Sequence, residues 1–172
     1  LIIGLWPPLV RAQAEEPWTP SVFLSQDILD ESGASANSAF PVLVADDWGN
    51  IHAFWPSQFH EKTGTIGDTV YYARWNGAEW SVPLDIIYMS GERVGGPQAA
   101  ADSQGWLHLV WKGPNYVWYS RAPITETGSA RGWSTPVPVL DSIVSGFSIA
   151  VDVEGNLHLV YAVEADVGAV YY

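Results

Sequence analysis

The sequence has no cysteine, few basic residues and little charge of either sign. The absence of Cys among 172 residues excludes disulfides, thiolate catalysis and zinc sites built on Cys ligands. Seven Lys and Arg stand against 19 Asp and Glu, so the net charge of −12 would repel a nucleic acid rather than bind it. Charged residues make up only 15% and hydrophobic residues 48%, which excludes a disordered chain.

Aromatic residues, glycine and proline are abundant by contrast. The chain has ten Trp, eight Tyr, 16 Gly and 12 Pro. Aromatic side chains favour strands, and Gly and Pro favour tight turns over long helices. The composition therefore predicts many short strands joined by turns.

The first residues resemble a targeting segment. An apolar run at 1–10 is followed by Ala12 and Ala14, which form the A-x-A pattern that signal peptidase reads. We expect residues 1–14 to be a signal peptide without its basic start, and the protein to be secreted or held at the cell surface. A membrane anchor is the alternative, but a run interrupted by two prolines is too short for a bilayer, which needs about 20 residues. We therefore predict no membrane span.

An internal repeat organises the rest of the chain. Segments 41–55, 97–111 and 147–161 align without gaps, and each reads as strand, D-x-x-G turn, strand. The offsets of 56 and 50 residues lie in the range of propeller blades and solenoid units. The repeat places Asp, Gly and His at three fixed positions: Asp46, Asp102 and Asp152; Gly49, Gly105 and Gly155; His52, His108 and His158.

Two further strands follow each pair. A V-x-Y motif recurs at 69–74, 116–121 and 169–172, and a W-S-x-P motif precedes an apolar stretch at 80–83 and 133–136. Four strands in about 50 residues are typical of a β-propeller blade. The predicted fold is all-β, a β-propeller of four-stranded antiparallel blades, with about three blades' worth of strands present.

The same pattern predicts the domain organisation. Residues 15–172 would form a partial propeller with an N-terminal fourth strand at 17–24, blades at 38–86 and 95–140, and an incomplete blade at 146–172. The strand at 17–24 would complete the last blade. Closed propellers use about four to eight blades. We therefore expect either a fragment of a longer protein or a homodimer that completes a six-bladed ring.

The motifs together resemble a known family. The pattern P-x-[IV]-x-x-D-x-x-G-N-[IL]-H-[LV]-[VF]-W, then [VI]-Y-Y-x-R and W-S-x-P, resembles the bacterial-neuraminidase-repeat propellers, which are similar to sialidases. The resemblance covers 18–172 and implies a mostly six-bladed, sialidase-like fold. The family's Asp-box has decayed at 74–80, and its Arg-Ile-Pro motif is missing. In such propellers the ligand-side loops join the second strand to the third and the fourth strand to the first of the next blade. Arg93 is the one arginine in these loops. A sialidase needs three arginines, so we predict no catalytic residue.

The repeated Asp and His are interpreted as structural. Residues at one repeat position lie on separate blades, so three His cannot cluster around a metal. We expect each His to bond to the backbone or to its turn Asp. A structural calcium ion would need Asp46 with Asp47 or Asp152 with Glu154, but no loop has EF-hand spacing, and we predict no cofactor.

Non-repeating polar residues on the ligand-side loops are better candidates for binding. The predicted function is a glycan- or protein-binding module, secreted and without its own catalytic site. The alternative is a fragment of a sialidase-like glycoside hydrolase whose catalytic residues lie mostly in missing blades. The candidate ligand-binding residues are Asp30, His60, Glu92, Arg93 and Lys112.

Overall fold

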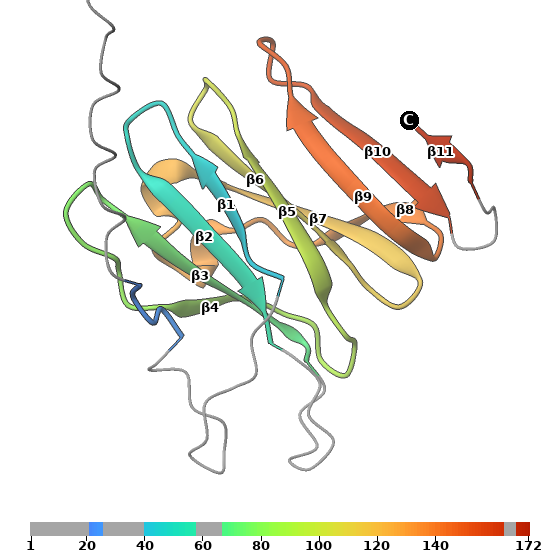
Figure 1. Ribbon diagram of the computed structural model, residues 1–172, viewed down its shortest axis with the longest axis horizontal. Helices are drawn as coiled ribbons and strands as arrows, with labels where there is room; N and C mark the ends of the chain where they lie inside the picture. Colours follow the sequence, from blue (N-terminus) through green and yellow to red (C-terminus); the bar gives the residue numbers. More distant parts are fainter. Residues whose placement is uncertain (1–20, 26–39, 58–66, 164–167) are drawn as a thin grey trace, which may run out of the picture.

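The structure, a computed structural model, describes residues 21–25, 40–57, 67–163 and 168–172. These residues form strands and two short 3-10 turns, η1 (Ile124–Glu126) and η2 (Ala130–Gly132), and contain no α-helix. Across the described ranges no helix is long and apolar enough to cross a membrane. The strands form three antiparallel sheets that lie side by side (Figure 1).

Two sheets have four strands and the third has three. The strand orders are β1-β2-β3-β4, β5-β6-β7-β8 and β11-β10-β9, so each sheet is an up-and-down meander. The bounds are β1 (Val42–Ala45), β2 (Ile51–Pro56), β3 (Thr69–Trp75), β4 (Leu84–Tyr88), β5 (Gly95–Ala101), β6 (Trp106–Lys112), β7 (Tyr116–Pro123), β8 (Val137–Asp141), β9 (Val144–Val151), β10 (Leu157–Val163) and β11 (Val170–Tyr171).

The second strands of the first two sheets, β2 and β6, are buried on both faces, which explains their near-continuous apolar sequences. In β2, Phe54 belongs to a cluster between the first and second sheets, whereas Ala53 and Trp55 belong to a cluster on the opposite face. Leu109 of β6 faces the first sheet and Val110 faces the third. Sheets stacked face to face with shared apolar clusters are the packing of propeller blades.

The first strands of the three sheets are the innermost. β1 packs beside β5, and β5 packs beside β9, although more than 40 residues lie between the two strands of each pair. Each first strand leads into its D-x-x-G turn, where Gly49, Gly105 and Gly155 have φ of 84°, 91° and 86°. Only glycine adopts this conformation without strain, which explains why the repeat keeps Gly there.

The up-and-down order separates two ends of the molecule. The turns β1–β2, β5–β6 and β9–β10 gather at one end of the sheets, while the β4–β5 and β6–β7 connections lie at the other (Figure 1). We call these the turn end and the loop end. Any site at the loop end is therefore separated from the repeated Asp and Gly by the length of a strand.

The N-terminal segment differs from the expected fourth strand. Residues 21–25, the described part of the segment at 17–24 and its next residue, form no strand and end in a turn. Leu24 packs on Ala53, Trp55 and Ala73 of the first sheet rather than beside β11. The buried apolar face of the first sheet offers Leu24 more contact than the short edge strand β11, which has two residues.

Candidate functional site

Each repeated Asp ties its own turn together. In the first turn, Oδ1 of Asp46 accepts hydrogen bonds from the amides of Trp48 (2.9 Å) and Asn50 (2.8 Å). Its Oδ2 accepts from Nδ2 of Asn50 (2.6 Å) and lies 3.2 Å from Nε2 of His52. The carboxylate thus meets four donors, as a turn cap does.

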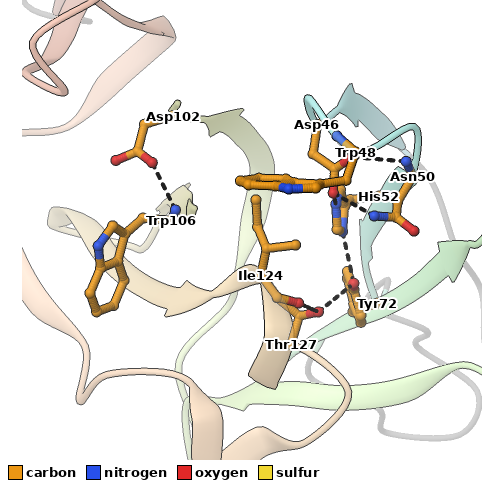
Figure 2. A network of polar contacts seen from close by, with 9 residues as sticks. All are labelled: Asp46, Trp48, Asn50, His52, Tyr72, Asp102, Trp106, Ile124 and Thr127. Atoms are coloured by element: carbon orange, nitrogen blue, oxygen red, sulfur yellow. Dashed lines mark hydrogen bonds and ion pairs between the residues drawn. The ribbon is translucent and has the colours of Figure 1, made fainter. Parts of the chain in front are cut away.

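His52 also contacts a tyrosine of the third strand of its sheet. Nδ1 of His52 lies 2.8 Å from the hydroxyl of Tyr72. His52 pairs with Arg74 across β2 and β3, so Tyr72 is its diagonal neighbour on the same face. Asp46, His52 and Tyr72 therefore form a chain of polar contacts that crosses three strands (Figure 2).

The other two sheets repeat the arrangement. Nε2 of His108 lies 3.3 Å from Oδ2 of Asp102, and its Nδ1 lies 2.9 Å from the Tyr119 hydroxyl. In the third sheet, His158 lies 3.1 Å from Oδ2 of Asp152 and 2.6 Å from the Tyr172 hydroxyl. We call each Asp–His–Tyr set a blade triad.

A residue from the β7–β8 connection of the second sheet contacts the first blade triad. The Tyr72 hydroxyl is hydrogen-bonded with Oγ1 of Thr127 at 2.8 Å, and Thr127 donates to the carbonyl of Ile124 at 3.0 Å. Thr127 follows η1 in the connection between β7 and β8 (Figure 2). The contact joins two blades, so it stabilises their packing as well as the turn.

The surroundings of the first triad shift the pKa values of its Asp and its His. Burial by itself raises the pKa of Asp46, but hydrogen bonds from Asn50, His52 and Trp48 outweigh it and hold the pKa below its ordinary 3.8. Burial lowers the pKa of His52 below 6.5, against the raising effect of Asp46. Burial thus disfavours the charged form of His52, while Asp46 is held as the carboxylate.

The other turn carboxylates follow the same rule. Burial raises the pKa of Asp102, but hydrogen bonds from Trp106, His108 and Gln104 lower it further than burial raises it. Hydrogen bonds, first of all those from Asn156, lower the pKa of Asp152. All three turn carboxylates are thus held in the ionised form.

A triad of Asp, His and a hydroxyl resembles a nucleophilic catalytic set in composition, but its placement serves structure. His52 has no exposed surface and Tyr72 is 1% exposed, so neither reaches a substrate. The expected bond between each His and its turn Asp is confirmed. The tyrosine partner was not predicted, although Tyr recurs in phase with the His and could have indicated it.

The triads offer no place for a metal. The residues that the structure describes contain no group of three or more His, Asp or Glu side chains close enough to hold an ion. Oxygen atoms that calcium would need are occupied by N–H donors at Asp46 and Asp152. The carboxylates therefore act on the backbone rather than on a cation.

Three of the five candidate binding residues lie at the loop end. Glu92 and Arg93 are exposed in the β4–β5 connection, and Lys112 is half-buried at the end of β6, where it pairs with Gly95. The structure thus brings these three to one end of the second blade. Asp30 and His60 lie outside the described residues.

The β4–β5 connection is anchored by backbone bonds. Met89 donates to the carbonyl of Asp68 and Val94 donates to that of Gly67, both at 2.8 Å. At its start stands Tyr88, which ends β4 and is 67% exposed. Sequence analysis did not single out Tyr88, because strands of this chain are rich in tyrosine throughout.

The loop end thus combines an aromatic ring with charged groups. An exposed tyrosine ring stacks on apolar faces such as that of a sugar ring, and guanidinium and ammonium groups donate hydrogen bonds to hydroxyl or carboxylate oxygens. At the turn end the repeated Asp and His are hydrogen-bonded within the blade triads. The loop end is therefore the candidate functional site.

Comparison with known proteins gives structural likeness only. No protein-family model matches the chain, and no curated protein matches it. The solved endo-arabinase of Bacteroides thetaiotaomicron superposes with a TM-score of 0.55 at 15% identity, over 74% of this chain and 52% of that one. The alpha-L-arabinanase of Penicillium chrysogenum, solved with arabinobiose, superposes with a TM-score of 0.50 at 12% identity, over 73% of this chain and 39% of that one.

The chain has a β-propeller fold. Its antiparallel sheets and the propeller neighbours confirm the predicted fold class, with about three blades present. The propeller spans about half the length of one neighbour and about two fifths of the other. At these identities the likeness establishes the fold and leaves activity to the residues of the site.

Proposed function

We propose that this propeller is a carbohydrate-binding module that uses its loop end and has no catalytic site of its own. The observation that carries the proposal is the difference between the residues at the turn end and those at the loop end. The repeated Asp and His form the blade triads at the turn end, and exposed Tyr88, Glu92 and Arg93 lie with half-buried Lys112 at the loop end.

Propeller geometry supports the choice of this end. Polar residues on variable loops carried by a rigid sheet are the usual way in which a scaffold presents a binding site. Tyr88 would supply stacking area, and Arg93 and Lys112 would supply donors for sugar hydroxyls. We also propose that the protein is a sialidase-like propeller that acts outside the cell, as the sequence resemblance and the A-x-A pattern after the first apolar run imply.

Arabinan is the first ligand to test, because both solved neighbours are named as arabinanases. The measurement is native electrophoresis of the full chain in gels with and without arabinan, with pectin, cellulose and a sialylated glycan as further additions. We expect at least one of these to retard the chain. Retardation by none of them would contradict a carbohydrate-binding function and favour a protein ligand.

Two variants and a matched control locate the site. Y88A and R93A should each weaken retardation about 10-fold, since loss of a stacking ring or a charged donor costs on the order of 1.5 kcal/mol. R131A removes the same charge from an exposed residue of η2, which lies in a connection at the turn end. We expect R131A to bind like the parent chain; equal losses in all three variants would contradict a site at the loop end.

The alternative is a fragment of a glycoside hydrolase. The names of the two solved neighbours, an arabinanase and an endo-arabinase, motivate this alternative. A glycoside hydrolase requires a pair of carboxylates that flank the scissile bond. Release of reducing ends from arabinan by the chain would establish hydrolysis. We expect binding without release, and release that E92Q abolishes would refute the non-catalytic proposal.

A further inference from the structure

One face of each sheet looks toward the next sheet along the chain, and the third sheet leaves this face open. Phe54 and Val110 occupy the same repeat position and are 0% and 1% exposed, whereas the equivalent Val160 is 41% exposed. Tyr72 is 1% exposed, whereas the equivalent Tyr172 is 82% exposed. The position of Phe54 and Val110, which is core in two sheets, is thus surface in the third.

The first sheet leaves the complementary face open at its innermost strand. Leu43 is 63% exposed, and Ala45 is exposed as well. The equivalent Ala99 packs on the cluster between the first two sheets, and Ile149 packs on the cluster between the second and third. The chain therefore carries both halves of the interface that its own sheets form twice.

The turns show the same incompleteness. In the first two D-x-x-G turns the third residue reaches the glycine of the next turn: Trp48 lies 3.5 Å from the position that a Cβ on Gly105 would occupy. Gln104 lies beside Gly155 and donates to the carbonyl of Glu154 at 2.9 Å.

The row of turns therefore has two unfilled ends. Within the described ranges no atom lies within 4 Å of the Cβ position of Gly49. Glu154 holds the third position of the last turn, and the described chain has no further turn for it to reach. A second row placed head to tail would bring Glu154 of one copy to Gly49 of the other.

We propose that a second copy of this chain covers the open faces, with the third sheet of one copy packed on the first sheet of the other. The contact continues the interface already present between neighbouring sheets, so it needs no new kind of packing. Two copies would supply six sheets, four with four strands and two with three, and closed propellers use about four to eight blades. Head-to-tail contacts of this kind close into a ring when the rotation allows it. The proposal is independent of the carbohydrate ligand.

Two features of the chain set the conditions for docking. Each copy carries a net charge of −12, and Glu154 would approach a turn that holds Asp46 and Asp47. Salt should therefore strengthen the contact, because it shortens the screening length from about 10 Å at 0.1 M to about 3 Å at 1 M. Leu24 covers the outer part of the first-sheet face, so docking exchanges that contact for the third sheet.

The absence of cysteine makes the contact testable by cross-linking. Val110 shares a cluster with Ile149, so by the repeat Val160 of one copy should meet Leu43 of the other. Differently tagged L43C and V160C chains, mixed in high salt and oxidised, should form the mixed disulfide. The control replaces L43C by V82C, because Val82 lies in the β3–β4 connection of the same sheet and is 73% exposed. We expect at least about five times more mixed product from the first pair.

Sedimentation equilibrium of the full chain completes the test. We expect a mass twice that of one chain in high salt, and we expect V160E to weaken association at least about 10-fold because it buries an unpaired charge in the contact. V82E adds the same charge outside the proposed contact and should leave the association unchanged. A single-chain mass at every concentration, cross-linking no greater than in the control, or an unweakened V160E dimer would overturn the proposal.

Discussion

The Tyr72 hydroxyl provides a sharp test of the blade triads, because the chain contains the same tyrosine in three environments. In the first sheet this hydroxyl is buried and contacts both Nδ1 of His52 and Oγ1 of Thr127 at 2.8 Å. Tyr119 is half-buried and contacts His108 at 2.9 Å. Tyr172 is 82% exposed. Replacement by Phe removes one oxygen in each case and leaves the ring in place.

The expected losses follow from burial and from the partners left without a bond. A buried hydrogen bond is worth about 1 kcal/mol net, and a buried group left unsatisfied costs about 1–3 kcal/mol. Y72F breaks two contacts and should lower the free energy of unfolding by about 2–4 kcal/mol. Y119F breaks one contact and should lower it by about 1 kcal/mol, whereas Y172F should stay within about 0.5 kcal/mol, as exposed substitutions do.

Urea unfolding at pH 7.5, followed by tryptophan fluorescence, measures all three variants. With a slope of about 2 kcal/mol/M, Y72F should move the midpoint down by about 1–2 M. The double variant with T127V should show a coupling of about 0.5–3 kcal/mol, because the two hydroxyls are in direct contact. Equal losses at the three tyrosines, or a loss below about 0.5 kcal/mol in Y72F, would refute the role given to the triad.

Two further predictions use the same assay. The unfolded chain binds protons more readily than the folded chain, at His52 below its ordinary pKa of 6.5 and at Asp46 and Asp102 below 3.8, since folding lowers all three pKa values. Stability should therefore fall in two steps on acidification from pH 7.5 to 3, and a midpoint that does not change over this range would contradict the shifts. G105A should lower the free energy of unfolding by about 1–3 kcal/mol, because φ at Gly105 is 91°. G128A, with open space around its Cβ position, should change it by less than about 0.5 kcal/mol. Similar effects of the two changes would show that the turn tolerates a side chain.

The sequence predicted those features that repeat over short distances. The D-x-x-G motif fixes a turn, because a glycine such as Gly155 adopts a positive φ and an Asp such as Asp152 bonds to amides two and four residues ahead. The bond from Asp to His is also local, since six residues separate them. Such contacts depend on strand geometry alone, and the fold class followed from their recurrence.

Contacts between separate strands and sheets were harder to predict. Tyr72 lies 20 residues from His52, and Thr127 lies 55 residues from Tyr72 in a connection without a counterpart in the repeat. The N-terminal segment was expected beside the last blade, but Leu24 packs on the first sheet. No local pattern encodes which apolar face a distant residue will cover, because the choice depends on the surface that folding leaves open.

By itself the sequence determined the blade, since alternating apolar residues and turn glycines specify strands and turns within about 50 residues. It also determined that nucleic acid is an unsuitable partner, because net charge is a property of composition. Only the tertiary structure showed that the repeated Asp and His bond to each other in blade triads at the turn end. It also showed that Arg93 and Lys112 both lie at the loop end. The physical reason is the stacking of the sheets. The same repeat position is buried where another sheet packs on it and is exposed in the last sheet.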